Sequence, residues 1–184
     1  MIKNRLKKGI YDDFSQDGAL EKYDAVWSEI KTILEQLDLL LSTSIETSEI
    51  ARFNALESGG EMHISSETAE VFQLARQMYE KTNGRFDPTV FPLVDLWGFS
   101  PRFTFGSDEQ MPYDRPWENG TRALPDDKYI SGFMQLVNMD GIALIGDEQQ
   151  GYTLKKNTPS VMIDGIAYHA RIDLGGIAKG CAVD

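Results

Sequence analysis

The sequence has few of the residues that form several common kinds of site. Cys181 is its one cysteine, which excludes an internal disulfide. His63 and His169 are its two histidines, and neither has a cysteine or a second histidine at zinc-ligand spacing, so we interpret both as structural. No nucleophile and base are paired in the Ser-His-Asp manner. The sequence therefore assigns no catalytic residue.

Basic residues and long apolar runs are also scarce. There are 18 lysines and arginines against 29 acidic residues, a net charge of −11. Such a surface repels nucleic acid and anionic membranes, so we expect neither as a partner. A phosphate-containing ligand stays compatible, because backbone N–H groups, one lysine and a metal ion can hold it. No run approaches the roughly 18 apolar residues of a membrane span, and no apolar signal core follows the basic start, so we expect no span and no export signal in this chain.

Hydrophobic periodicity predicts helices early in the chain and short strands late. The predicted helices cover 17–41, 66–82 and 125–137, and the predicted strands cover 142–145, 152–154, 161–163 and 169–172. Asp17 and Ser65 are the expected N-caps of the first two helices, and Pro125 is expected in the first turn of the third. Residues 42–64 are expected to form a polar connection and 100–121 a surface excursion. This order favours an α+β fold, with helices packed on a mixed or antiparallel sheet.

The most informative segment is Arg171-Ile172-Asp173-Leu174-Gly175-Gly176-Ile177-Ala178-Lys179-Gly180, which we interpret as a strand, a glycine turn and a helix start. Glycines let a ligand approach the backbone, and the first N–H groups of a helix lack internal partners. Together with the helix dipole they could receive a pyrophosphate, which Lys179 would reach from the first turn. Asp173 could hold a polar group of the ligand. The spacing matches neither the P-loop nor the dinucleotide fingerprint, so a plain strand-to-helix turn is the alternative.

A second segment, Phe86-Asp87-Pro88-Thr89-Val90, has the pattern of a short helix start. Asp87 fits the N-cap and Pro88 the first helical position. The N–H groups of such an end are available to a ligand. The alternative for the large apolar residues here and just downstream is that they belong to the core.

Three segments together carry a family resemblance. Phe86–Val90 with Pro92–Phe99 is similar to the pattern FDPTV...PLV.LWGF, residues 173–184 to DLGGIAKGYAVD, and residues 41–54 to LSTY..DSEISRFN. These three patterns are those of the ApbE family, and they occur here in the family's order. Together they cover nearly the whole chain from residue 17 onward.

The resemblance implies a fold, a reaction and two ligands. The fold is an ApbE-like (T-fold-like) domain, of which residues 1–184 would form a partial, N-terminal portion without the C-terminal half. Family members bind FAD with Mg and transfer FMN to a threonine of a partner protein, releasing AMP, while some hydrolyse FAD to FMN and AMP instead. Members are often exported lipoproteins. We expect this chain alone to be a poor catalyst.

The resemblance also assigns candidate site residues by position. Those that match FAD contacts, or frame the same turn, are Phe86, Asp87, Pro88, Thr89, Asp173 and Lys179. Gly176 matches a position whose backbone carbonyl helps to coordinate the metal. Ser44 stands where members usually carry an aromatic ring that helps to hold FAD. Replacing that ring removes a stacking surface, worth about 0.5–1.5 kcal/mol for aromatic pairs.

Two further functions stay open at this point. Ser44 is compatible with an FAD-binding module of impaired catalysis, which tight FAD binding without AMP release would select. The acidic composition and the 100–121 excursion are compatible with a structural or interaction domain, which the absence of any thermal shift with FAD would favour.

Overall fold

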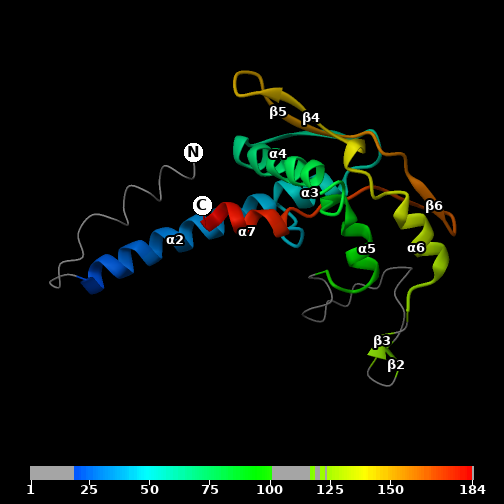
Figure 1. Cartoon of the computed structure of the whole chain (residues 1–184), viewed down its shortest axis with the longest axis horizontal. Coiled ribbons are helices and arrows are strands. Elements are labelled where there is room, and N and C mark those ends of the chain that lie inside the picture. The colour runs from blue at the N-terminus through cyan, green and yellow to red at the C-terminus, as the bar shows by residue number, and fades with distance from the viewer. Residues whose placement is uncertain (1–18, 101–116, 119–120, 123, 184) are drawn as a thin grey trace.

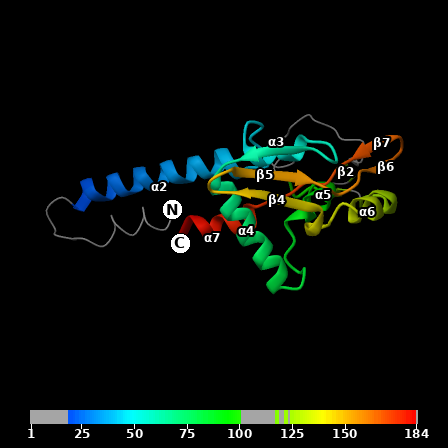
Figure 2. The ribbon, with the colours of Figure 1, turned by 90° about the horizontal axis from the view of Figure 1, so that it is seen from above.

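The computed structural model describes residues 19–100, 117–118, 121–122 and 124–183. A small sheet lies against helix α4, with α7 beside α2, and α2 projects from the rest as a long rod (Figure 1; Figure 2). The helices are α2 (Ala19–Leu41), α3 (Glu49–Ala55), α4 (Ser66–Lys81), α5 (Phe91–Leu96), α6 (Asp127–Met134) and α7 (Gly175–Val183), with 3-10 turns at Pro88–Val90 and Met139–Gly141. The strands are β1 (Glu61–Ile64), β2 (Trp117–Glu118), β3 (Thr121–Arg122), β4 (Ile142–Asp147), β5 (Gly151–Lys156), β6 (Val161–Ile163) and β7 (Ile166–Tyr168). The α+β expectation is confirmed.

The main sheet is antiparallel, with strand order β1–β5–β4. Leu154 at its centre faces Met62 on one side and Leu144 on the other. Since side chains alternate along a strand, Leu154 and Lys156 point to the same face, and both are fully buried. Two antiparallel hairpins, β2–β3 and β6–β7, complete the pairing among the described residues.

Two hydrophobic clusters hold these elements together. The larger one joins the end of α2, helices α3 and α4, the main sheet and the segment before α7; its fully buried members include Ile50, Phe53, Phe72, Ala75, Met139, Ile142, Leu154, Ala170, Ile172 and Leu174. The smaller one joins α5, α6 and β6 through Leu96, Tyr129, Phe133, Leu136 and Ile163. The larger cluster thus fixes residues 170–174 against α3.

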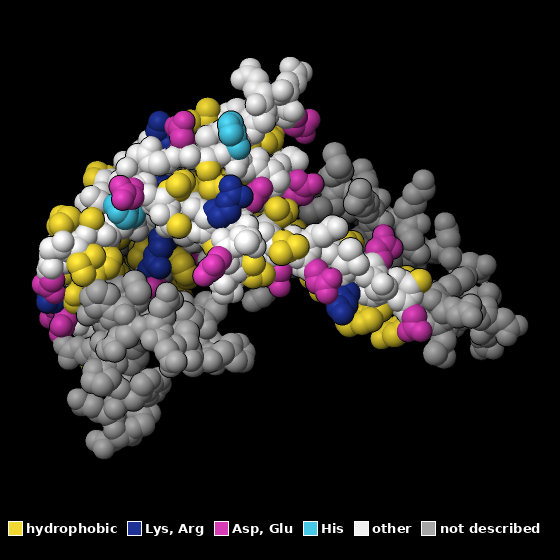
Figure 3. Space-filling model, turned by 180° about the vertical axis from the view of Figure 1, so that it is seen from behind, with side chains coloured by type: hydrophobic (Ala, Val, Ile, Leu, Met, Phe, Trp, Pro, Cys, Tyr) yellow, Lys and Arg dark blue, Asp and Glu magenta, His cyan; other side chains and the backbone are white. Residues whose placement is uncertain are grey.

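Helix α2 leaves part of its apolar stripe exposed to solvent. Among its residues 23–41, the buried ones are Leu37 and Leu41 near the C-terminal end, whereas Tyr23 is 66% and Trp27 is 58% exposed. Hydrophobic side chains are visible along this helix in Figure 3, among scattered acidic and basic ones. No helix in the described part of the chain combines the length and hydropathy needed to cross a membrane.

Several expected elements are confirmed with small shifts. The helix over 66–82 is α4, and the Ser65 hydroxyl caps it by accepting a hydrogen bond from the Thr68 N–H at 3.2 Å. The strands over 142–145, 152–154 and 161–163 are β4, β5 and β6. The Asp17 cap and most of the excursion, residues 101–116, lie outside the described residues.

Three expectations are wrong. Residues 42–64 are more than a connection, because they contain α3 and β1, which at seven and four residues are too short to show a clear period. The third helix begins at Asp127 after Asp126 at the N-cap, so Pro125 precedes it. Residues 169–172 form no strand, because the backbone of Ile172 pairs with the side chain of Asn54 instead of a neighbouring strand.

Candidate functional site

The first component of the candidate site is the turn at Asp87. Its carboxylate Oδ1 accepts hydrogen bonds from the Thr89 N–H at 2.8 Å and the Thr89 hydroxyl at 2.6 Å. Pro88 takes the first position of the 3-10 turn, where its missing N–H costs nothing. The predicted cap and proline position are therefore confirmed. Thr89 is fully buried, so it supports the turn from beneath.

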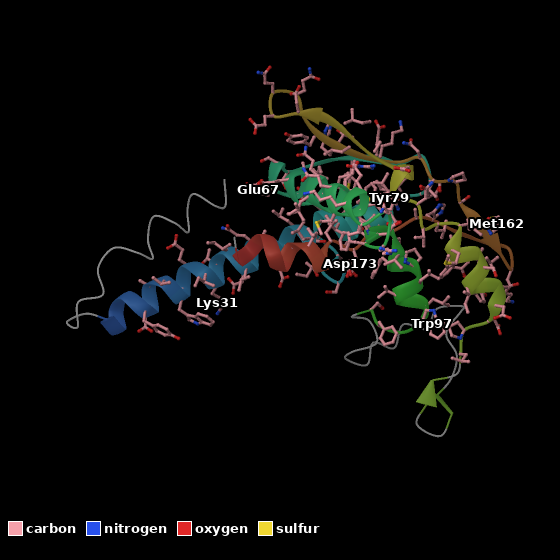
Figure 4. All side chains as sticks on the ribbon, viewed as in Figure 1. Lys31, Glu67, Tyr79, Trp97, Met162 and Asp173 are labelled. Atoms are coloured by element: carbon pink, nitrogen blue, oxygen red, sulfur yellow. The ribbon has the colours of Figure 1, made fainter. Side chains whose placement is uncertain are left out.

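The second component is the connection from Ile172 into α7, where Figure 4 labels Asp173. The Asp173 N–H donates to the Pro88 carbonyl at 2.9 Å, which joins the two turns directly. A β-carbon at Gly176 would lie 3.6 Å from Phe86 Cε2, so the start of α7 sits next to that ring. The structure thus brings together Phe86, Asp87, Pro88, Thr89, Asp173 and Gly176.

The N–H groups at the start of α7 are less available than the sequence suggested. Asp173 Oδ1 accepts from the Gly175 N–H at 2.7 Å and so acts as a cap. The Ile177 and Ala178 N–H groups both donate to the Leu174 carbonyl, at 3.0 and 2.9 Å. Within the described chain, the Gly176 N–H has no backbone acceptor, and Gly176 is exposed. Of the free N–H groups that the sequence suggested at the start of α7, the one left without an acceptor in the described chain is that of Gly176. It lies at the positive end of the helix dipole.

Asn54 was missed as a site residue. Its side-chain amide donates to the Ile172 carbonyl and accepts from the Ile172 N–H, both at 2.8 Å. It therefore holds the residue immediately before Asp173 by both backbone groups. Asn54 belongs to the RFN part of the family pattern, which is the signal that could have drawn attention to it.

Lys156 was also missed. Its side chain is fully buried. The Nζ atom donates hydrogen bonds to the Leu56 carbonyl at 2.6 Å and the Asn54 carbonyl at 3.1 Å. The same atom lies 5.1 Å from the centroid of the Phe53 ring. Burial, reinforced by the positive charge of Arg171, lowers the pKa of Lys156 to about 7. A neutral amine has two N–H groups, which matches the two carbonyls that it meets.

An ion pair fixes the segment on its other flank. Arg171 donates to Asp95 Oδ2 at 2.9 Å, and its guanidinium lies 5.0 Å from the centroid of the Phe91 ring. Asp95 is only 2% exposed and also accepts a 2.6 Å hydrogen bond from the Ser100 hydroxyl. Residues 171–173 are thus held by side chains from α3 and α5 together with the Pro88 carbonyl.

One of the predicted residues does not join this network. Ser44 is exposed in the α2–α3 connection, where it bonds to the Ser42 hydroxyl at 3.0 Å. Lys179 belongs to α7, and its side chain lies outside the described part of the chain. Among the residues described, no group of three or more His, Cys, Asp or Glu side chains is placed to hold a metal ion.

The fold and this pair of joined turns define an α+β domain in which the exposed Gly176 lies at the start of α7. Comparison with known sequences specifies the kind of domain further. The sequence model of the ApbE family matches residues 10–184. The chain belongs to the ApbE family.

Two curated relatives carry the same name. The chain is 30% identical over 156 residues to the FAD:protein FMN transferase of Escherichia coli K12, which covers 85% of this chain and 37% of that protein. It is 31% identical over 174 residues to the enzyme of the same name from Haemophilus influenzae, which covers 94% of this chain and 42% of that protein. The chain therefore spans about two fifths of the length of these relatives.

Solved structures give the same result for the fold. The flavinyl transferase ApbE of Pseudomonas stutzeri, in its apo form, matches with a TM-score of 0.65 and 29% identity. The flavin transferase ApbE of Vibrio cholerae matches with a TM-score of 0.66 and 28% identity. Each alignment covers 88% of this chain and 42% of the other. The expected ApbE-like fold is confirmed.

Proposed function

We propose that this chain forms part of the site of an enzyme that transfers FMN from FAD to a threonine of a partner protein with the help of Mg. The observation that carries the proposal is the 2.9 Å hydrogen bond from the Asp173 N–H to the Pro88 carbonyl, which joins the two family motifs. The names of the relatives support the same reaction.

The reaction is a phosphoryl transfer. The threonine oxygen forms a bond to the phosphorus of the FMN half, and the bond from that phosphorus to the bridging oxygen breaks. AMP leaves with the bridging oxygen, and the threonine proton passes to the surrounding acceptors. Positioning and charge stabilisation, rather than a covalent role of the protein, dominate such reactions.

The residues would share the work by position. The exposed Gly176 N–H and the positive end of α7 would face a phosphate oxygen. Phe86, which packs beside Gly176, would contact the nucleotide, and Lys179 would pair with the diphosphate. Asp173 would receive a hydrogen bond from a polar group of FAD through an oxygen not used to cap Gly175. The turn itself would be kept in a fixed conformation by Asp87, Pro88 and Thr89.

Mg would be held only partly by this portion of the protein. The Gly176 carbonyl would supply one oxygen ligand of the kind that Mg prefers, as the match of this residue to the family pattern implies. Oxygens of the FAD diphosphate would also be ligands of the kind that Mg takes. When bound, the metal offsets charge on the diphosphate.

The test is FAD binding by the 184-residue chain, followed by flavin fluorescence, with MgCl₂ or with EDTA. We expect binding that strengthens with Mg and weakens about tenfold in Asp173→Asn, which keeps the Gly175 cap and loses the charge; tenfold corresponds to about 1.4 kcal/mol. The matched control is Asp164→Asn, at an exposed turn residue between β6 and β7. Wild-type protein that binds no FAD under either condition would contradict the proposal.

The second candidate, an FAD-binding module without transfer, is favoured by one observation. Ser44 offers a hydroxyl bonded to Ser42 where relatives of the family would present a ring. Chromatography of these mixtures after a threonine-bearing acceptor protein is added separates the two functions, since an enzyme then releases AMP as it modifies the acceptor and a binding module leaves FAD intact.

A further inference from the structure

The side chain of Asn54 replaces a missing strand partner for Ile172. One amide group makes both hydrogen bonds that a neighbouring strand would have made, across 118 residues of sequence. Ile172 is fully buried, so its backbone groups have no access to water and depend on this partner. Removing the Asn54 side chain would leave both groups unsatisfied.

Lys156 binds the backbone carbonyl of Asn54, whereas Ile172 binds its side chain. The carbonyls of Asn54 and Leu56 are at the C-terminal end of α3, where helix carbonyls lack intrahelical partners and carry the negative end of the dipole. The Lys156 amine satisfies both. Because Lys156 extends from the central strand β5, it anchors the end of α3 to the sheet.

Asp173 sits at the far end of this chain of contacts. Its neighbour Ile172 is fixed by Asn54, and its own N–H is fixed by Pro88. The Asp173 carboxylate in turn caps Gly175 and sets the first turn of α7. A shift of the Asn54 amide would therefore be transmitted to the residues proposed to meet FAD.

We propose that Asn54 and Lys156 are positioning residues, through which the main sheet sets the placement of Asp173 and the start of α7 in the flavin site. The placement itself follows from the contacts above, and its importance for FAD rests on the proposed function. Neither residue would touch the substrate.

Hydrogen–deuterium exchange tests the placement without any ligand. In Asn54→Ala and in Lys156→Met, we expect exchange to rise at least tenfold in the peptide covering 171–178, with no change in the α4 peptide covering 66–81. Lys155→Met is the matched control. Lys155 directly precedes Lys156 on β5, and its Nζ pairs with Glu61 Oε2 at the surface, 2.9 Å away. Asn54→Asp, which keeps the acceptor and loses the donor, replaces Asn54→Ala if that change prevents folding. Unchanged exchange in 171–178, or an equal rise in both peptides, would overturn the proposal.

A double-mutant cycle tests the link to FAD. If Asn54 acts through Asp173, Asn54→Ala and Asp173→Asn each weaken FAD binding, and the double variant is weaker by clearly less than the product of the two factors. If the double variant weakens FAD binding by the full product of the two single factors, the two residues act independently. That result would refute the positioning role while leaving the proposed function intact. Wild-type protein that fails to bind FAD would refute the proposed function alone, because the exchange measurement decides the placement.

Discussion

The buried amine of Lys156 makes stability depend on pH in a specific window. Its pKa is about 7 in the folded protein, whereas an exposed lysine has an ordinary value near 10.5. Between these two values the unfolded chain binds one proton more than the folded chain. Linkage then requires the free energy of unfolding to rise with pH, by roughly 1 kcal/mol per pH unit.

The expected magnitude follows from the width of the window. From pH 7.5 to 9.5, the contribution of Lys156 to stability rises by about 2–3 kcal/mol. As pH falls towards 7 this contribution is lost, and below 7 both states are protonated, so the dependence on this residue ends. Lys156→Met cannot titrate and should lack this rise.

Urea unfolding at half-unit pH steps measures the effect. The quantity of interest is the wild-type free energy of unfolding minus that of Lys156→Met, because other titrating groups contribute to both proteins. Lys155→Met should keep the full wild-type dependence, since Lys155 is partly exposed and paired at the surface. Parallel curves for the wild type and Lys156→Met would show that the amine is not neutral in the folded state, and the reasoning would be refuted.

Two local packing features give further predictions. Ser65→Ala removes the cap of α4 and should lower the free energy of unfolding by about 1 kcal/mol, while Ser66→Ala, one residue into the helix, should change it much less; equal effects in urea would contradict the cap assignment. Gly146→Ala would place a β-carbon against the Gly151 carbonyl oxygen, a backbone atom, at a residue whose φ is 96°, and should cost about 1–3 kcal/mol, which a thermal melt with unchanged stability would disprove.

The sequence predicts best where a local rule decides the structure. Ser65 caps α4 and Asp87 caps the turn at Pro88 because a short polar side chain meets nearby N–H groups, which is visible within four residues of sequence. Asn83, with a φ of 51°, ends the helix for a similar local reason. Helix α3 and strand β1 escape prediction because they are held by contacts with distant segments rather than by a long period.

The candidate site shows the same division. The two turns are marked by their residues, but the hydrogen bond between Asp173 and Pro88 depends on tertiary structure. Lys156 is partly predictable in retrospect, since it stands two residues after Leu154 and strand alternation assigns both to the buried face. Its partners at the end of α3 lie about a hundred residues earlier, and no spacing rule connects them.

The 118-residue separation between Asn54 and Ile172 has a consequence for biosynthesis. At about 5–20 residues per second, a ribosome needs roughly 6–24 s between the two. During that time α3 can form its turns, but the amide of Asn54 has no partner to hold. The Asn54 side chain must therefore stay unpaired, accessible to chaperones or to wrong partners, until Ile172 leaves the ribosome.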